Sequence, residues 1–205
     1  MNNNLQVSGL CFQERGPYTF DISAGTITGL QGASGAGKTL LLRAIADLDP
    51  HVGEVRLGEM VCDKVPAPDW RKSVGLLQAE SFWWYDTVGE HFPLPGGSVL
   101  VTLSQLGFEQ DVFSWQVSRI STGEKQRLAI ARLLQYTPRA LLLDEPTASL
   151  DAANIERTET VLIDYCRKQQ APLLWVSHDH DQLSRVADHE FQLDSAGNLQ
   201  LVREA

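Results

Sequence analysis

The chain has 205 residues, of which 43% are hydrophobic and 21% are charged, so we expect one compact domain with a buried core. This composition excludes disorder as the main state. Lys and Arg number 17 against 26 Asp and Glu, giving a net charge of -9. A surface of that charge would repel a phosphate backbone, so we expect no nucleic-acid partner.

Targeting and redox signals point to the cytoplasm. The apolar runs are far shorter than the roughly 18 residues that a membrane span needs. The first four residues, Met-Asn-Asn-Asn, lack the basic start and apolar stretch of a secretory signal, which predicts a cytoplasmic protein. Cys11, Cys62 and Cys166 are far apart and form no C-x-x-C pair, which predicts reduced thiols rather than a disulfide framework or a zinc cage.

The first part of the chain has the pattern of strands, then a loop and a helix. Two predicted strands are separated by a turn at Gly16-Pro17, which indicates an antiparallel opening. Leucines at helical spacing predict the first helix, and a loop with several Pro and Asp residues separates two later strands. The predicted strands are 5–12, 18–22, 26–31, 54–57 and 73–77, and the predicted helix is 38–48.

The remainder begins with a stretch rich in aromatic residues and prolines, and then alternates between helices and strands. Helices are predicted at 98–106, 109–115, 123–136 and 152–170, and strands at 140–143, 173–177, 190–193 and 199–202. This order predicts an α/β fold with a mostly parallel core sheet, an N-terminal antiparallel β subdomain and an inserted helical subdomain. We expect a single domain, with its core at about 1–78 and 130–205 and its helical lobe at about 79–129.

A glycine-rich segment lies between the third predicted strand and the first predicted helix. It reads Gly-Ala-Ser-Gly-Ala-Gly-Lys-Thr and fits G-x-x-x-x-G-K-[ST] in the required context. Such a loop points its backbone N–H groups at phosphate oxygens, and the helix N-terminus adds its dipole. Lys38 should reach the β- and γ-phosphates, and the Thr39 hydroxyl should hold Mg²⁺. The predicted nucleotide-binding residues are Gly32, Ser34, Gly35, Gly37, Lys38 and Thr39.

Two acids end the apolar run at 140–143. Asp144 lies where the carboxyl end of a buried strand opens toward a ligand, and it suits Mg²⁺ coordination through its water shell. Glu145, one residue further on, can orient and deprotonate an attacking water. The plainer interpretation is a solvated acidic pair before a turn at Pro146. The upstream phosphate loop favours the catalytic one.

The helix predicted after the lobe opens with Ser121-Thr122-Gly123-Glu124. Ser121 and Glu124 are spaced as a capping box, which by itself explains their presence. The stretch also resembles the signature motif of ABC-type ATPases, L-S-G-G-Q followed by an Arg-containing helix. Ser121 and Gly123 match that motif, Glu124 stands in the Gln position, and Thr122 replaces the first of the two signature glycines.

Other marks of the ABC-type ATPases fall in the expected order. Gln78, after a predicted strand, resembles the Q-loop glutamine that senses Mg²⁺ and the attacking water. Residues 148–151, Ala-Ser-Leu-Asp, resemble the D-loop, and His178 resembles the switch histidine that acts on the γ-phosphate. Phe12 stands where the family has an aromatic that stacks on adenine, and Tyr18 competes for that role. Either ring could instead belong to the core.

The resemblance implies two kinds of partner. In the family, two domains pack head to tail with each ATP between one copy's phosphate loop and the other's signature helix, so Ser121 and Gly123 would act across the dimer. The interval between Gln78 and Ser121 is too short for the long coiled coils of chromosome-associated members and suits the lobe with which transporter ATPases grip a membrane permease. The aromatic segment 82–85 would face the permease or the lobe's own core.

The expected protein is therefore a cytoplasmic ATPase, held at the inner face of the cell membrane by an integral permease. An alternative is a nucleotide-gated regulatory module that dimerises on ATP and transports nothing. Intact Glu145 and His178 favour hydrolysis over that alternative. A third possibility is a small-molecule kinase, and the signature stretch speaks against it. Hydrolysis without an acceptor separates an ATPase from a kinase.

Overall fold

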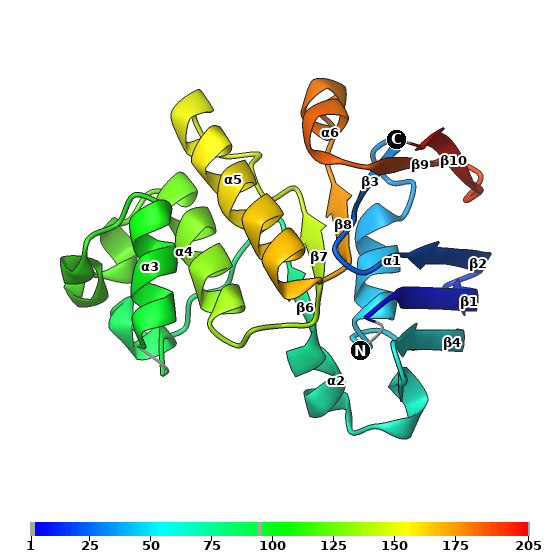
Figure 1. Cartoon of the computed structure of the whole chain (residues 1–205), viewed down its shortest axis with the longest axis horizontal. Coiled ribbons are helices and arrows are strands. Elements are labelled where there is room, and N and C mark those ends of the chain that lie inside the picture. The colour runs from blue at the N-terminus through cyan, green and yellow to red at the C-terminus, as the bar shows by residue number, and fades with distance from the viewer. Residues whose placement is uncertain (1–2, 94–95, 205) are drawn as a thin grey trace.

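The computed structural model describes residues 3–93 and 96–204, and within them two sheets lie on either side of one helix (Figure 1). The strands are β1 (Leu5–Phe12), β2 (Arg15–Ile22), β3 (Ile27–Gly32), β4 (Val52–Leu57), β5 (Met60–Val61), β6 (Val74–Leu77), β7 (Ala140–Asp144), β8 (Leu173–Val176), β9 (His189–Leu193) and β10 (Leu199–Glu204). The α-helices are α1 (Lys38–Ile45), α2 (Ala67–Ser73), α3 (Gly97–Gln105), α4 (Thr122–Leu134), α5 (Ala152–Gln169) and α6 (His180–Val186). The 3-10 helices are η1 (Cys62–Lys64), η2 (Gly89–His91), η3 (Gln110–Ser114) and η4 (Val117–Arg119).

The smaller sheet is antiparallel, with the strand order β2-β1-β4-β5. In β2 the large apolar side chains Tyr18, Phe20 and Ile22 alternate with exposed residues, as expected of a strand with one buried face. That face packs toward α1, which also contacts β3 and β7 of the larger sheet. The expected N-terminal antiparallel subdomain is confirmed.

The larger sheet is mostly parallel, with the strand order β10-β9-β3-β8-β7-β6. Only the edge strand β10 runs antiparallel to its neighbour. Strand β7 is buried along its whole length because both faces of the sheet are covered. Leu141 and Leu143 pack with residues of α4 and α5, whereas Leu142 packs on the opposite face with residues of α1. The predicted α/β fold is therefore confirmed.

One edge of this sheet collects the segments that carry the predicted motifs. Strands β3, β8, β7 and β6 are parallel neighbours, so their carboxyl ends lie at the same edge. The loops that leave this edge begin at Ala33, Glu145, Ser177 and Gln78. A parallel sheet binds ligands at this edge. The fold thus brings the predicted catalytic segments together.

Two predictions for the N-terminal half are wrong in detail. The pair Gly16-Pro17 lies inside β2 and not in the turn, which falls at Gln13-Glu14. Pro17 is tolerated there because β2 is an edge strand of its sheet. The predicted loop after residue 57 contains β5, η1 and α2, and Pro68 lies within the first turn of α2, where a missing N–H costs nothing.

Other boundaries also differ from the predictions. Helix α1 ends at Ile45 rather than at residue 48, and Asp47 beyond it has a left-handed φ of 55°. The helix predicted at 109–115 is the 3-10 helix η3, and the short helix α6 was not predicted. Asp179 caps α6 by accepting a hydrogen bond from the N–H of Gln182. The expected lobe boundary near residue 129 falls inside α4.

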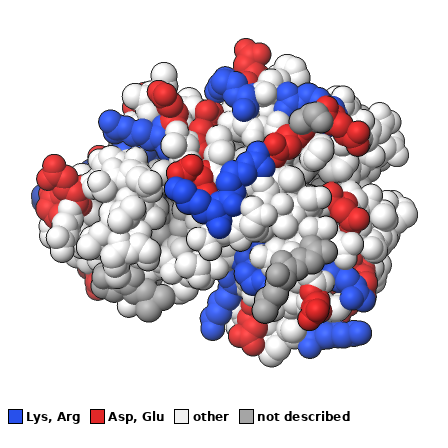
Figure 2. Space-filling model, viewed as in Figure 1, with Lys and Arg blue, Asp and Glu red and all other residues white. Residues whose placement is uncertain are grey.

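No helix in the described ranges is both long and apolar enough to cross a bilayer. On the face drawn in Figure 2, basic and acidic side chains are interspersed and form no continuous basic area. The helical lobe at the left of this view is largely uncharged.

All three cysteines are free thiols, as expected.

Candidate active site

The glycine-rich loop is closed on itself between β3 and α1. Gly37 caps α1 with φ at 106°, a left-handed conformation that side chains of L-residues resist, so glycine is required at this position. The Lys38 ammonium donates hydrogen bonds of 2.7 Å and 3.1 Å to the carbonyl oxygens of Gly32 and Ala33. The ammonium group is therefore bound to the loop's own carbonyl oxygens, and it would have to leave them to contact a phosphate.

Lys38 is buried for a lysine, with 7% of its surface exposed. Burial lowers the pKa of its ammonium group, while the negative charges of Glu145 and Asp144 act in the opposite direction. A cation that has already lost much of its water is well placed to bind a phosphate anion, because little further desolvation is needed. The buried ammonium can thus serve the loop as an anion-binding group once it leaves the Gly32 and Ala33 carbonyls.

A hydroxyl and a carboxylate from different elements meet beside the loop. The Thr39 hydroxyl at the start of α1 donates a hydrogen bond of 2.7 Å to Asp144 Oδ2 at the end of β7. Asp144 is 4% exposed. Hard oxygen ligands from Ser/Thr and Asp are what Mg²⁺ takes in phosphate-loop proteins, so this pair suits the predicted ion.

Glu145 directly follows Asp144 and has an unusual backbone. Its φ is 51°, a left-handed conformation that costs a non-glycine residue on the order of 1 kcal/mol. Its N–H donates to the Val176 carbonyl, which fixes the turn after β7. Backbone strain of this kind gathers at functional sites, where neighbouring structure holds it in place.

The Glu145 carboxylate faces His178. Glu145 Oε1 lies 3.3 Å from His178 Nε2, and this oxygen is buried without an aligned hydrogen-bond donor among the described residues. Burial raises the pKa of the Glu145 carboxyl group, and the nearby His178 and Lys38 partly offset this effect. A carboxylate with a raised pKa and an unused acceptor can take a proton from water.

These groups line one open pocket of about 270 Å³ at the carboxyl edge of the core sheet. Its lining includes Lys38, Thr39, Asp144, Glu145 and His178. Ser34, Gly35 and Gly37 also line it, and Gly32 stands at the base of the loop. The structure therefore brings together residues that lie more than a hundred positions apart in the sequence.

Gln78 is at the border of this pocket. Its neighbour Ala79 lines the pocket, whereas Gln78 itself lines a second groove of about 330 Å³ beside the aromatic segment. The sheet thus places Gln78 between the phosphate loop and the predicted permease surface. Its sensing role stays a prediction.

Ser121 and Gly123 do not line the phosphate pocket. Ser121 caps α4, and the predicted capping box is confirmed: the Glu124 N–H donates to Ser121 Oγ at 3.2 Å, and the Ser121 N–H donates to Glu124 Oε2 at 2.8 Å. A Cβ at Gly123 would lie 2.9 Å from the carbonyl oxygen of Ser149, so glycine allows α4 to approach the predicted D-loop. Both residues are therefore placed at a surface outside their own chain's pocket.

The aromatic residues proposed for adenine are covered. Phe12 and Tyr18 are 4% and 2% exposed, and their rings stack on each other with centroids 5.6 Å apart. Both belong to the core of the antiparallel sheet. Neither ring offers a free face in this conformation, and the adenine-stacking role of Phe12 stays a prediction.

Arg15 contacts the phosphate loop, and its role there was not predicted from the sequence. Its guanidinium group donates hydrogen bonds to the carbonyl oxygens of Gly35 and Ala36, and its side chain lies against Gly37. The arginine thus ties β2 to the phosphate loop. Its sequence neighbourhood reads as a turn, and only the pairing of β2 with β1 brings it over the loop.

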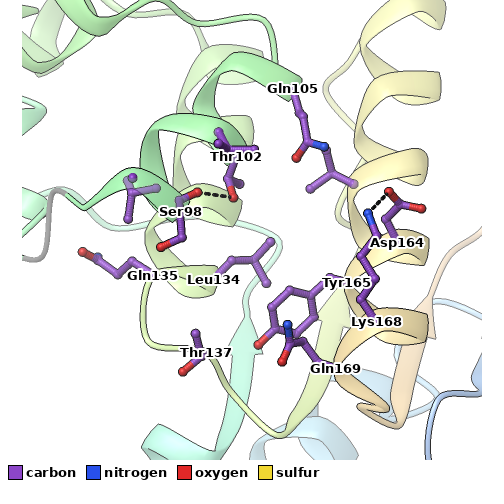
Figure 3. Close-up of a pocket in the computed structure, with 14 residues that line it drawn as sticks. Ser98, Thr102, Gln105, Leu134, Gln135, Thr137, Asp164, Tyr165, Lys168 and Gln169 are labelled. Carbon is purple, nitrogen blue, oxygen red and sulfur yellow. Dashed lines mark hydrogen bonds and ion pairs between the residues drawn. The ribbon is translucent and has the colours of Figure 1, made fainter.

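A larger cavity lies elsewhere, between α3, α4 and α5 (Figure 3). It has a volume of about 350 Å³ and shares no residue with the phosphate pocket. Its one ammonium group, on Lys168, is paired with Asp164 at 2.7 Å. Tyr165 donates its hydroxyl to the Pro138 carbonyl. The charged groups of this cavity pair with each other and leave none for a ligand, so the candidate site remains the phosphate pocket.

Comparison with known proteins agrees with this geometry. The family model described as ABC transporter matches residues 16–148. The chain is 36% identical to the tungstate uptake system ATP-binding protein TupC of Peptoclostridium acidaminophilum, covering 93% of this chain and 94% of that protein. It is 31% identical to the molybdenum import ATP-binding protein ModC of Hahella chejuensis, covering 93% of this chain and 58% of that protein.

Solved structures show the same fold. A structure of an ATP-binding subunit of an ABC transporter superposes with a TM-score of 0.83 at 19% identity, covering 97% of this chain and 90% of that one. A bacterial Atm1-family ABC exporter with ATP bound gives 0.84 at 21% identity, covering 97% of this chain and 38% of that one. The chain belongs to the ABC transporter family, as an ATP-binding subunit with ATPase activity.

Proposed function

We propose that two copies of this chain hydrolyse ATP between them and drive a membrane permease. The observation that carries the proposal is the separation of the site into two halves. Lys38, Thr39 and Glu145 line an open pocket, while Ser121 and Gly123 lie at the capped start of α4 outside it. A second copy, packed head to tail, would close the pocket with its own α4.

Each residue of the open pocket has a role in this proposal. Lys38 leaves the Gly32 and Ala33 carbonyls and binds the β- and γ-phosphates, joined by the loop N–H groups and the dipole of α1. Glu145 accepts the proton of the attacking water. His178, 3.3 Å from Glu145, orients that carboxylate and contacts the γ-phosphate. Gln78 couples the nucleotide state of the site to the groove that it lines beside the aromatic segment.

Thr39 and Asp144 would hold Mg²⁺. Their oxygens are already paired at 2.7 Å, and both come from rigid elements, the start of α1 and the end of β7. The bound ion would neutralise charge on the β- and γ-phosphates. Thr39 would bind it directly and Asp144 through its water shell.

The contribution of α4 across the dimer can be tested at Ser121. The substitution Ser121→Asp keeps a residue that caps helices well but places a negative charge against the partner's γ-phosphate. We expect hydrolysis to fall by about 10²-fold, the cost of losing one oxyanion donor, with nucleotide binding by the isolated chain unchanged. Phosphate release and nucleotide titration measure the two quantities.

Ser121→Asn is the matched control, because Asn also caps helices and adds no charge. We expect it to keep the thermal stability of the wild type and most of its hydrolysis. Equal activity of the Asp and Asn variants would count against a role for Ser121 at the phosphate.

The pH profile of hydrolysis tests Glu145 as the base. Because the ionised carboxylate acts, activity should be lost as the pH falls through the pKa of Glu145, which burial raises above its usual value. His178 lowers that pKa, so His178→Gln should move the acid limb of the profile to higher pH as well as lower the maximum rate. A profile of kcat against pH is the measurement. An unshifted acid limb in the variant would contradict the assignment.

The surface next to Gln78 suits a membrane partner. Phe82, Trp84 and Tyr85 are 68%, 64% and 48% exposed. The segment is nonetheless ordered: the N–H groups of Trp84 and Tyr85 both donate to His91 Nε2 at 3.1 Å, and Arg132 lies over the Trp84 ring. Exposed aromatic side chains on a fixed backbone are typical interface anchors. We therefore assign this segment to the permease contact.

The relatives support transport over regulation, since TupC and ModC are named for tungstate uptake and molybdenum import and another relative, FetA of Escherichia coli, for probable iron export. We expect the chain to rebind saturably to inside-out vesicles of its native membrane that have been stripped of it. The double variant Phe82→Ser, Trp84→Ser should rebind at least about tenfold more weakly, because exposed aromatic anchors supply much of an interface's energy.

Val101→Ser, at an exposed apolar position of α3, is the control and should rebind like the wild type. Equal rebinding by the double variant would remove this segment from the permease contact. Rebinding by no form of the chain would favour the regulatory alternative.

A further inference from the structure

Three side chains of metal-ligand type meet in the segment that follows α1 and runs through β4 to η1. A ring nitrogen of His51, the Cys62 thiol and a carboxylate oxygen of Asp63 all lie within 4.8 Å of one another. Among the described residues this is the only such group of three or more. Cys62 is 3% exposed, His51 is half-buried and Asp63 is exposed. None of the three lines the phosphate pocket.

The hydrogen bonding of His51 leaves one ring nitrogen for a ligand. His51 Nδ1 lies 3.2 Å from the Asp49 carbonyl oxygen. A carbonyl can only accept, so Nδ1 carries the hydrogen of the neutral ring and Nε2 keeps its lone pair. His51 Nε2 is buried and has no hydrogen-bond partner among the described residues. A ring with one nitrogen on a backbone carbonyl and the other unused is how histidine is held in metal sites.

The residue that orients His51 is itself fixed. The Asp49 carboxylate accepts two hydrogen bonds from Arg43, at 2.7 Å and 2.6 Å, so the backbone beyond α1 is tied to the last turn of that helix. The Asp49 carbonyl and the imidazole are therefore held in place before any ligand arrives. This is the support from outside the ligand shell that metal-binding histidines usually have.

We propose that His51, Cys62 and Asp63 bind a zinc ion, with water as the fourth ligand. A thiolate, an imidazole and a carboxylate are the donors that Zn²⁺ prefers. Zinc bonds of about 2.0–2.3 Å set ligand atoms about 3.3–3.8 Å apart, so separations within 4.8 Å must close by at most about 1.5 Å. Rotation of the exposed Asp63 side chain can bring its carboxylate closer to the other two ligands. The sequence spacing of the three residues matches no known zinc motif, so only the fold reveals the group.

Binding would exchange a proton for the metal. Cys62 is a free thiol in the protein without metal. The S–H bond breaks, the proton leaves to solvent and a Zn–S bond forms, with no change in oxidation state. The ion would join the end of β5 to the chain that enters β4, and so link both to the last turn of α1. Bound zinc should therefore stabilise the fold.

Zinc binding can be tested directly, without nucleotide, on untagged protein from which metal has been removed with a chelator and the chelator then removed. Zinc is titrated in competition with a chromogenic chelator. Co²⁺, used in parallel, reports a thiolate ligand through its charge-transfer absorption. We expect one equivalent of zinc per chain, a Co²⁺–thiolate band and a raised Tm.

The variants Cys62→Ser, His51→Gln and Asp63→Asn identify the ligands. Cys62→Ser and His51→Gln should each weaken zinc binding by at least about 100-fold. Loss of a residue that only supports a ligand costs up to about 100-fold, and loss of the ligand itself should cost at least as much. Cys11→Ser and His180→Gln are matched controls at another thiol and another imidazole, and should bind like the wild type. If Cys62→Ser does not fold, His51→Gln and the Co²⁺–thiolate band of the wild type carry the same test.

Absence of tight stoichiometric zinc binding would overturn the proposal. So would zinc binding that survives unchanged in Cys62→Ser and His51→Gln, or that is lost in the controls, since the ion would then lie elsewhere. These readouts do not depend on ATP hydrolysis, so they remain valid if the dimer mechanism fails.

Discussion

Replacing Glu145 by Gln should stop hydrolysis and make ATP hold two copies of the chain together. The amide keeps the size of the side chain but cannot accept the proton of water, so the rate should fall by about 10²–10⁴-fold, the usual contribution of a general base. ATP should still bind, because Lys38 and the loop are intact. The bridging γ-phosphate would then persist, and the dimer with it.

Size-exclusion chromatography with light scattering measures this outcome. We expect the Glu145→Gln variant to elute as a dimer with ATP and as a monomer with ADP. Glu190→Gln is a useful comparison, because Glu190 is also buried and also faces a histidine, His180, but lies outside the phosphate pocket. A Glu145→Gln variant that stays monomeric at saturating ATP would contradict the mechanism.

Replacing Lys38 by Ala should weaken nucleotide binding as well as slow turnover. Lys38 is the only ammonium group lining the pocket, and hydrogen bonds to charged groups contribute about 1.5–3 kcal/mol each, so ATP affinity should fall by roughly 10- to 100-fold. Calorimetric titration with ATP is the measurement, and Lys168→Ala, at the lysine of α5 that is paired with Asp164, is the control. Unchanged ATP affinity would mean that the loop does not bind phosphate.

Loss of Lys38 also removes the hydrogen bonds to the Gly32 and Ala33 carbonyls. Because Lys38 lines the open pocket, water can take the place of its ammonium at those carbonyls, and the Tm of the nucleotide-free protein should change little. A large loss of Tm without nucleotide would mean that the lysine has a mainly structural role.

The parts of the site that could be predicted from the sequence are those where local chemistry dictates residue type. Gly37 must adopt a left-handed φ, and the run before Asp144 is apolar because both faces of β7 are buried. The order of strand, loop and helix then places Lys38, Glu145 and His178 at one edge of a parallel sheet. Such features show in spacing and composition alone.

The parts that could not be predicted depend on contacts between distant segments. Arg15 reaches the phosphate loop only through the pairing of β2 with β1, and Phe12 is covered because Tyr18 from the next strand stacks on it. His51 and Cys62 come together only when β4 and β5 form their hairpin. No local pattern encodes such encounters.

Mixing two inactive variants tests the central claim that two copies share each ATP. Lys38→Ala lacks the phosphate lysine, and Ser121→Asp lacks the signature contact. A mixed dimer would carry one site in which both residues are altered and one in which both are intact. We predict that hydrolysis returns on mixing, to at most about a quarter of the wild-type rate per chain, since half of the dimers are mixed and one of their two sites works. A mixture no more active than the two variants apart would contradict the account.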